Sequence, residues 1–204
     1  MTLMDAPIVS SADTVAEPRA FRWTREAYYW LYEQGRFDGR RVELIDGEII
    51  EMPAQKHVHA WSIVKSERAL RPVAEPANCI RTQMPLNLSQ WSDPEPDLAV
   101  VLGAVESWEG KEHPTSALLV VEVADTTLAF DRRVKQAIYA AAGIQEYWIV
   151  NLVDRQLEVY RDPRPDPQNA RASRYADVTT LSPQDVVSPL AFPAARLVAG
   201  TLFG

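Results

Sequence analysis

The chain has 204 residues, of which 47% are hydrophobic and 24% are charged, a composition typical of a soluble globular protein with one well-buried core. Its apolar runs fall far short of the roughly 20 residues that a membrane helix needs, so the sequence predicts no membrane span. The net charge of −7 excludes a protein whose whole surface is basic and coats nucleic acid.

The termini and the cysteine content bound the organisation of the chain. We expect residues 1–20 to be a disordered lead-in and residues 21–204 to form a single domain. The first 19 residues lack a basic cluster followed by an apolar core, so they do not resemble a secretory signal. The one cysteine, Cys79, cannot form an internal disulfide and is predicted to be a buried strand residue. These features predict a cytoplasmic protein.

The first elements expected along the chain are a short helix and a hairpin. Residues 24–33 begin with a threonine that can cap a helix, and Gly35 is placed to end it. Two strand-like runs over 41–51 are separated by Asp46 and Gly47, the pair that most readily adopts the positive φ angles of a tight turn. The sequence therefore predicts a β-hairpin there.

A second helix and two strands should follow. Apolar residues recur at helical spacing over 57–70, and Pro72 is expected to mark the helix end. Residues 79–84 and 98–102 are predicted to be extended. The polar stretch 103–116 contains glycine and proline and is expected to be a loop or a mobile flap.

The rest of the chain predicts a buried strand, a helix and a strand pair. The strand covers 118–123, and the helix is expected to be capped by Asp131 and ended by Gly143. Residues 146–160 predict two strands joined by a tight turn. The proline-rich stretch 163–168 is not expected inside a strand, and short β segments complete the tail.

Two acidic residues in strand-like runs are the main functional signal. Asp97 opens one strand after Pro96, and Glu122 lies near the end of another. A carboxylate in a buried strand is costly unless something binds it, and two together favour a shared divalent metal. The carbonyl of Val123 and water molecules can complete the coordination of Mg²⁺, and Lys135, one turn into the predicted helix, can reach the end of the Glu122 strand.

Each of these residues also has an ordinary structural interpretation. Asp97 can cap a turn, Glu122 can pair with an arginine, and Lys135 can be a solvated helix residue. The joint placement of the three favours the metal site. Two basic clusters have the same ambiguity, because either can be a local nucleic-acid surface or a solvated helix face. These clusters are Lys65, Arg68 and Arg71, and Arg132, Arg133 and Lys135.

Together these motifs resemble the PD-(D/E)xK nuclease signature, and in particular the Uma-type restriction endonuclease family of bacteria. The resemblance covers roughly residues 22–161. It is carried by the segments Glu43-Leu44-Ile45-Asp46-Gly47-Glu48, Met52-Pro53 with His59 shortly after, Pro94-Glu95-Pro96-Asp97-Leu98-Ala99-Val100, Val121-Glu122-Val123-Ala124-Asp125-Thr126-Thr127, Asp131-Arg132-Arg133-Val134-Lys135, and Tyr139-Ala140-Ala141-Ala142-Gly143-Ile144-Gln145-Glu146-Tyr147-Trp148-Ile149-Val150.

The resemblance implies an α/β (α+β) restriction-endonuclease-like core, a mixed central sheet flanked by helices. It also implies Mg²⁺, with Mn²⁺ able to substitute, near Asp97 and Glu122. The superfamily's usual lysine stands two residues after the acid, where this chain has Ala124. Lys135 would then be a lysine relocated to the helix, as is common in this branch.

Three further residues are candidates for the site. Glu43 is a candidate third acid, with an exposed strand residue as its alternative. His59 is a candidate for phosphate contact or proton transfer, and is as often a partly buried structural residue. Arg132 is a second candidate for contact with substrate.

The leading interpretation is a Mg²⁺-dependent endonuclease in which Asp97, Glu122, Lys135 and Glu43 carry the chemistry. Its expected partner is nucleic acid, with DNA favoured, and dimerisation across a groove would answer the acidic net charge. One alternative is a noncatalytic nucleic-acid-binding or regulatory relative that keeps the fold. A third is a hydrolase of another phosphate ester that uses the same metal site.

Overall fold

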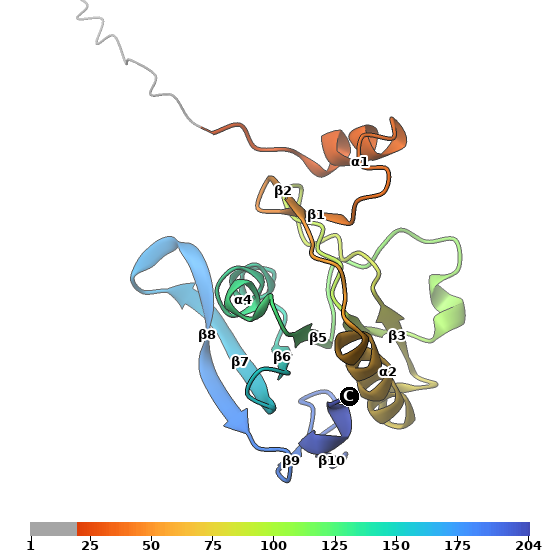
Figure 1. The fold of residues 1–204 in the computed structure, drawn as a ribbon, viewed down its shortest axis with the longest axis vertical. Coiled ribbons are helices and arrows are strands. Elements are labelled where there is room, and N and C mark those ends of the chain that lie inside the picture. The colour runs from red at the N-terminus through yellow and green to blue at the C-terminus, as the bar shows by residue number, and fades with distance from the viewer. Residues whose placement is uncertain (1–19) are drawn as a thin grey trace, which may run out of the picture.

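A six-stranded mixed sheet forms the centre of the protein (Figure 1). The structure is a computed structural model and describes residues 20–204, apart from the side chains at positions 170 and 171, so nearly all of the predicted lead-in lies outside the described residues. Only β5 and β6 run parallel, and all other neighbours are antiparallel. The strands, in sheet order, are β3 (Asn78–Thr82), β4 (Leu98–Leu102), β5 (Leu119–Ala124), β6 (Glu146–Asn151), β7 (Gln156–Asp166) and β8 (Asn169–Leu181).

Helices cover both faces of this sheet, as the family resemblance implies (Figure 1). On one face α2 (His57–Ala74) packs through Ile63 and Leu70, and on the other α4 (Gln136–Ala141) packs through Tyr139. No helix within residues 20–204 combines the length and apolar character needed to cross a bilayer. The remaining elements are α1 (Arg25–Glu33), the 3-10 helices η1 (Val105–Trp108) and η3 (Ala199–Leu202), α3 (Leu128–Phe130), the π-helical turn η2 (Asp131–Lys135), and two small sheets, β1 (Val42–Ile45) with β2 (Glu48–Glu51) and β9 (Val186–Val187) with β10 (Leu197–Val198).

The predicted hairpin is confirmed, and it is tied to the rest of the fold by backbone hydrogen bonds. Asp46 and Gly47 have φ angles of 48° and 83° and join β1 to β2. The Gly47 N–H donates to the carbonyl of Trp91 at 2.7 Å, and the Asp93 N–H donates to the carbonyl of Leu44 at 2.8 Å. All four residues of β1 are buried, so Glu43 is fixed inside the protein.

The helix that begins at residue 57 continues past Pro72, so the predicted end of this helix is wrong. A proline in a helix removes one backbone hydrogen bond and crowds the carbonyl four residues earlier. Here Pro72 lies in the last turn of α2, and the guanidinium of Arg71 bridges Glu67 and Glu75 across that turn. The Glu75 N–H also donates to the Arg71 carbonyl at 3.1 Å, which completes the turn.

The proline-rich stretch after residue 162 also differs from the prediction, because β7 runs through Pro163 and Pro165 to Asp166. Strand β6 ends its pairing with β7 at Arg161, so the residues beyond pair only with β8. One edge of this part of β7 is therefore open, and a missing proline N–H on an open edge removes no sheet hydrogen bond.

Asp131 does not cap a helix, which corrects the predicted start. Helical backbone begins at Leu128, and Asp131 lies inside it with φ −64° and ψ −42°. Its buried carboxylate accepts a hydrogen bond of 2.7 Å from the Thr127 hydroxyl. The predicted helix end is confirmed, because Gly143 follows the last turn with φ 74°. The expected loop at 103–116 contains one short helical turn, η1.

We predict that Gly47→Ala destabilises the protein more than Gly39→Ala. Both glycines have positive φ, which costs an alanine about 1 kcal/mol, but only at Gly47 would an added Cβ meet a neighbour, the Cβ of Arg22 at 2.7 Å. Urea unfolding should give a loss of about 1 kcal/mol for Gly39→Ala and at least about 2 kcal/mol for Gly47→Ala. Equal losses would contradict the close packing of Arg22 on the turn.

Candidate active site

Strand register brings Asp97 and Glu122 opposite each other. Strands β4 and β5 are antiparallel with Leu98 opposite Val121, so one step further along the chain places Asp97 opposite Glu122. Side chains alternate along a strand, and Val121 and Val123 pack on the α2 face. Glu122 therefore points to the α4 face. The same alternation in β4 places Asp97 with Ala99 and Val101 on that face.

Direct hydrogen bonds join the two acidic positions. The Asp97 N–H donates to Glu122 Oε2 at 3.2 Å, and the Val123 N–H donates to Asp97 Oδ2 at 2.8 Å. The Gln83 amide adds a contact of 3.3 Å to Asp97 Oδ1. Both residues are buried, at 4% and 6% exposure. The position of each carboxylate is thus fixed by the strand that carries the other.

Glu122 also accepts hydrogen bonds from the α4 side of the sheet. Its Oε1 atom accepts one hydrogen bond from Lys135 Nζ at 3.1 Å and another from the Tyr139 hydroxyl at 2.7 Å. Burial raises the pKa of Glu122 to about 8, and the neighbouring carboxylates, first Asp97, add to this against the opposing charge of Lys135. This carboxylate therefore carries a desolvation cost that a bound cation would relieve.

Lys135 is the buried cation of the site. Its ammonium lies 2.5 Å from Glu43 Oε2 as well as 3.1 Å from Glu122, and its side chain is only 1% exposed. Burial alone would lower the pKa of Lys135, but the charges of Glu122 and Glu43 outweigh it and raise the pKa, so the group stays charged. Lys135 closes the π-helical turn η2, two turns after the helical segment begins rather than one as predicted. Such turns change the direction of the side chains that follow.

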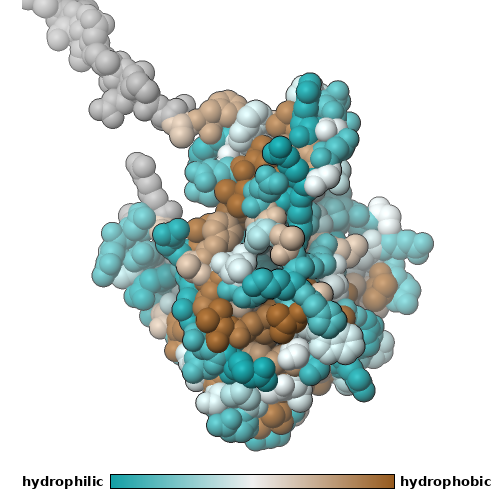
Figure 2. Space-filling view, viewed as in Figure 1, coloured by the Kyte–Doolittle hydropathy of each residue, from teal (hydrophilic) through white to brown (hydrophobic). Residues whose placement is uncertain are grey.

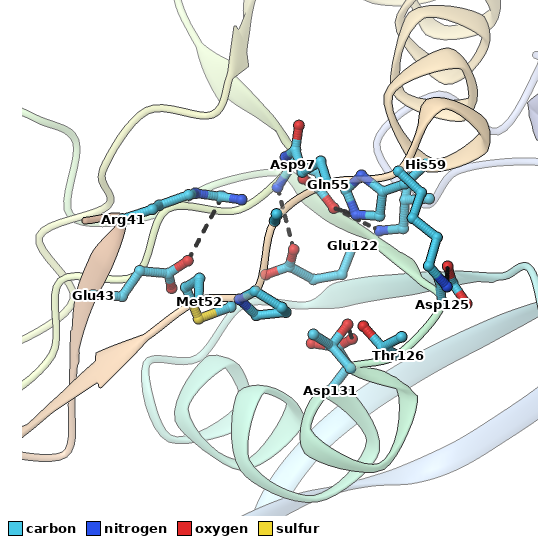
Figure 3. A pocket seen from close by; sticks show the side chains of 15 residues that line it. Arg41, Glu43, Met52, Gln55, His59, Asp97, Glu122, Asp125, Thr126 and Asp131 are labelled. Carbon is cyan, nitrogen blue, oxygen red and sulfur yellow. Dashed lines mark hydrogen bonds and ion pairs between the residues drawn. The ribbon is translucent and has the colours of Figure 1, made fainter. Parts of the chain in front are cut away.

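A small pocket opens over these groups (Figure 3). Arg41, Met52, Gln55 and His59 line it together with carboxylates from four segments of the chain. Those carboxylates belong to Glu43, Asp97, Glu122, Asp125 and Asp131. The lining contains one arginine, Arg41, and one lysine, Lys56. Lys56 is paired with Asp125 at 2.8 Å. The excess of negative charge makes the pocket suitable for a cation.

His59 lies in the pocket beside Asp97. Its Nε2 atom is 3.3 Å from Asp97 Oδ2, and its Nδ1 atom is buried with no hydrogen-bond partner among the described residues. Burial would lower the pKa of His59, but the hydrogen bond and charge of Asp97 outweigh it, and the pKa is raised. The ring can therefore hold a proton next to Asp97.

Arg132 lies outside the pocket lining. Its guanidinium makes a two-pronged contact with Glu158 on β7, with Nε 3.0 Å from Oε2 and Nη2 2.6 Å from Oε1. This geometry makes Arg132 a partner of a buried acid, and a role in substrate contact stays a prediction.

The residues present fit Mg²⁺ with an incomplete protein shell. Asp97 and Glu122 offer hard carboxylate oxygens, and Glu43 Oε1 is buried without a hydrogen-bond partner among residues 20–204. Within that same range no three histidine, cysteine, aspartate or glutamate side chains form a closed metal-binding group. Mg²⁺ commonly binds to one or two carboxylates and keeps several waters, so two carboxylates with one carbonyl, as expected at Val123, suit it.

Three residues of the site were not singled out from the sequence. Tyr139 bonds to Glu122, Asp131 lines the pocket, and Arg41 lies 3.8 Å from Glu43. Tyr139 and Asp131 belong to the segments that carry the family resemblance. Asp131 lies four residues before Lys135 and Tyr139 four residues after it, so a helix places all three on one side. This spacing could have indicated both residues as members of the site.

The fold is a mixed α/β fold whose central sheet positions a cluster of buried acids around a lysine. The family described as "Putative restriction endonuclease", Uma2, matches residues 25–199, and the chain belongs to this family.

A solved structure supports the fold. The chain is similar to a crystal structure from Anabaena variabilis described as "a putative nuclease belonging to DUF820", with a TM-score of 0.59 and 17% sequence identity. The match covers 80% of this chain and 90% of the other. At this identity the likeness shows the fold alone. No curated protein matches the chain.

We predict that Lys135→Met destabilises the protein by about 3–5 kcal/mol, because it leaves Glu43 and Glu122 buried without their cation. Urea unfolding measures the loss. The double variant Glu43→Gln/Lys135→Met removes one of the two buried acids and should recover part of it. A Lys135→Met protein as stable as wild type would show that the lysine does not hold these acids.

The Arg132–Glu158 pair should make a pH-dependent contribution to stability. Burial would raise the pKa of Glu158, but hydrogen bonds, first from Arg132, lower it. Because the pKa of Glu158 is lower in the folded state, the pair stabilises the protein fully at pH values above the unfolded pKa of about 4.3. This contribution is lost as the pH falls through the folded-state pKa.

The difference in unfolding free energy between wild type and Arg132→Gln should therefore be full at pH 7 and shrink toward pH 3. Arg133→Gln is the control, since its side chain is exposed and makes no ion pair among the described residues. A difference that stays constant with pH would argue against this pair as the cause.

Proposed function

We propose that this pocket binds Mg²⁺, with Mn²⁺ able to substitute, and hydrolyses phosphodiester bonds of nucleic acid. The observation that supports this most is the register of β4 and β5, which sets Asp97 and Glu122 opposite each other beneath one pocket. Membership of the Uma2 family supports the same reaction class.

The proposal gives each residue a role. Asp97, Glu122 and the carbonyl of Val123 would hold the metal, which would polarise the phosphoryl oxygen and lower the pKa of a water. Lys135 holds Glu122 and Glu43 in place through its two ion pairs, and its positive charge would offset negative charge that develops at the phosphate. His59, whose Nε2 atom lies 3.3 Å from Asp97 Oδ2, can hold a proton beside the metal site.

A noncatalytic nucleic-acid-binding relative is the second candidate. It is favoured by one observation, namely that each oxygen of Glu122 and of Asp97 already accepts a hydrogen bond or ion pair from the protein. In that case the cluster would be a structural network, and Lys135 would be its counter-ion. Metal-dependent cleavage separates the two candidates.

We expect cleavage of supercoiled plasmid, single-stranded DNA or RNA that requires Mg²⁺ or Mn²⁺. Asp97→Ala should lose it by about 1000-fold or more, because the metal would have one carboxylate fewer and about 4 kcal/mol of transition-state stabilisation would be lost. Asp177→Ala is the control, since it removes an exposed aspartate on β8. Metal binding measured by calorimetry should fail in Asp97→Ala and persist in Asp177→Ala.

Lys135→Arg tests the lysine in the same assay, because it keeps the charge and removes the fit between Glu43 and Glu122. Loss of cleavage with metal binding retained would support a role at the phosphate. Folded, metal-loaded wild-type protein that cleaves none of the three substrates would contradict the nuclease proposal and support the binding module.

Partners and location remain part of the proposal. DNA is the favoured substrate, a homodimer would bring two basic surfaces together across a groove, and the single buried cysteine fits the reducing cytoplasm. Sedimentation of the purified protein measures the oligomeric state directly.

A further inference from the structure

Helix α2 presents a row of aromatic and basic side chains to solvent. His57, Trp61, Lys65 and Arg68 follow one another at intervals of four, four and three residues, so they lie along one face of the helix. His57, Trp61 and Arg68 are exposed and Lys65 is partly exposed, while Ile63 and Leu70 face the core. We call these four residues the α2 stripe.

The two basic residues of the stripe have no acidic partner. Neither Lys65 nor Arg68 forms an ion pair within residues 20–204. Arg71, the third member of the basic cluster seen in the sequence, is bound by Glu67 and Glu75, so those two acids are already neutralised. A shallow groove beside the helix is lined by Lys65, Arg68 and also Arg196, which is exposed and unpaired in the same part of the structure.

The two aromatic residues of the stripe stack on each other. The rings of His57 and Trp61 are nearly parallel, with an interplanar angle of 10° and centroids 6.4 Å apart. Trp61 is 49% exposed, although it is one of the largest apolar side chains. Exposed aromatic faces beside lysine and arginine are the combination that binds unpaired bases, because every base has a face that can stack.

The stripe begins at the edge of the candidate active site. Lys56 and His59 flank His57, and both line the pocket. From His59 to Arg68 the helix rises about 14 Å at 1.5 Å per residue. His59 points to the opposite side of the helix from the stripe, so a strand lying along the stripe would reach the pocket by passing around the amino-terminal end of α2 at Lys56.

We propose that the α2 stripe, together with Arg196, binds an unpaired nucleic-acid strand and leads it into the pocket. The phosphates would contact Lys65, Arg68 and Arg196, and a base would stack on Trp61. The inference rests on the proposed function, because it names the form of nucleic acid that the same site receives. It also gives the acidic protein a local surface of the sign that phosphates need.

A second copy of the chain fits this surface less well. A twofold dimer across the stripe would bring Lys65 and Arg68 against the same residues of the partner, and like charges in contact are unfavourable. In the view of Figure 2, which matches that of Figure 1, hydrophobic residues lie in groups separated by hydrophilic ones. The charges favour an anionic partner.

Binding is measured by fluorescence anisotropy in EDTA, so that cleavage cannot interfere, with a labelled 12-nucleotide single strand and a duplex of the same sequence. Wild type should bind the single strand more tightly. Trp61→Ala should weaken single-strand binding about tenfold and leave duplex binding unchanged. Lys65→Gln/Arg68→Gln should lower the slope of log K against log salt by about 1.4, from two lost phosphate contacts.

Two control variants match these changes. Trp30→Ala removes a tryptophan that is 58% exposed on α1, and Arg36→Gln/Lys111→Gln removes two exposed cations outside the stripe. Both should bind the strand like wild type. The inference is overturned if wild type binds no single strand, if the controls lose as much as the stripe variants, or if the stripe variants bind normally and only dissociate a dimer in sedimentation.

Cleavage of the same strand in Mg²⁺ separates the two proposals. Strand binding that depends on the stripe without any cleavage would support the stripe and contradict the nuclease. Cleavage by wild type with unchanged strand binding in the stripe variants would support the nuclease and overturn the stripe.

Discussion

The structure depends on one buried ion cluster, in which Lys135 lies between Glu43 and Glu122. Carboxylates removed from water are costly, and removing the partner of a buried charge is costlier still. Three separate parts of the chain must therefore fold together: the hairpin that carries Glu43, the strand that carries Glu122 and the π-helical turn that carries Lys135. The cluster joins the small β1–β2 sheet to the central sheet, and its unbalanced negative charge lies at the pocket.

Local signals in the sequence predicted the elements whose shape is set by a few neighbouring residues. Asp46 and Gly47 readily adopt the positive φ angles of a tight turn, and Gly143 ends a helix through its own backbone. The errors fall where distant contacts decide. Pro72 lies inside the last turn of α2, where Arg71 also pairs with Glu75. Pro163 lies in a strand because the pairing of β6 with β7 ends at Arg161 and leaves that edge of β7 open.

The candidate site shows the same division. That Asp97 and Glu122 meet follows from strand register, and the sequence indicated it through two acids in two buried runs. The partners of charged side chains were not predictable, since Arg132 and Arg71 look in sequence like Lys65 and Arg68. Only the fold shows that the first two are neutralised and the last two are free among the described residues. Net charge gives the sum of such groups and not their distribution.

The central claim is that Asp97 and Glu122 hold a divalent cation in the pocket. A crystal of the protein soaked in Mn²⁺ and measured at a wavelength where manganese scatters anomalously tests it most directly. The account predicts an anomalous peak within coordinating distance of both carboxylates, and none in crystals of Asp97→Ala. Well-ordered crystals with manganese only at surface sites, and with Lys135 still bound to Glu122, would contradict it and leave a structural ion network.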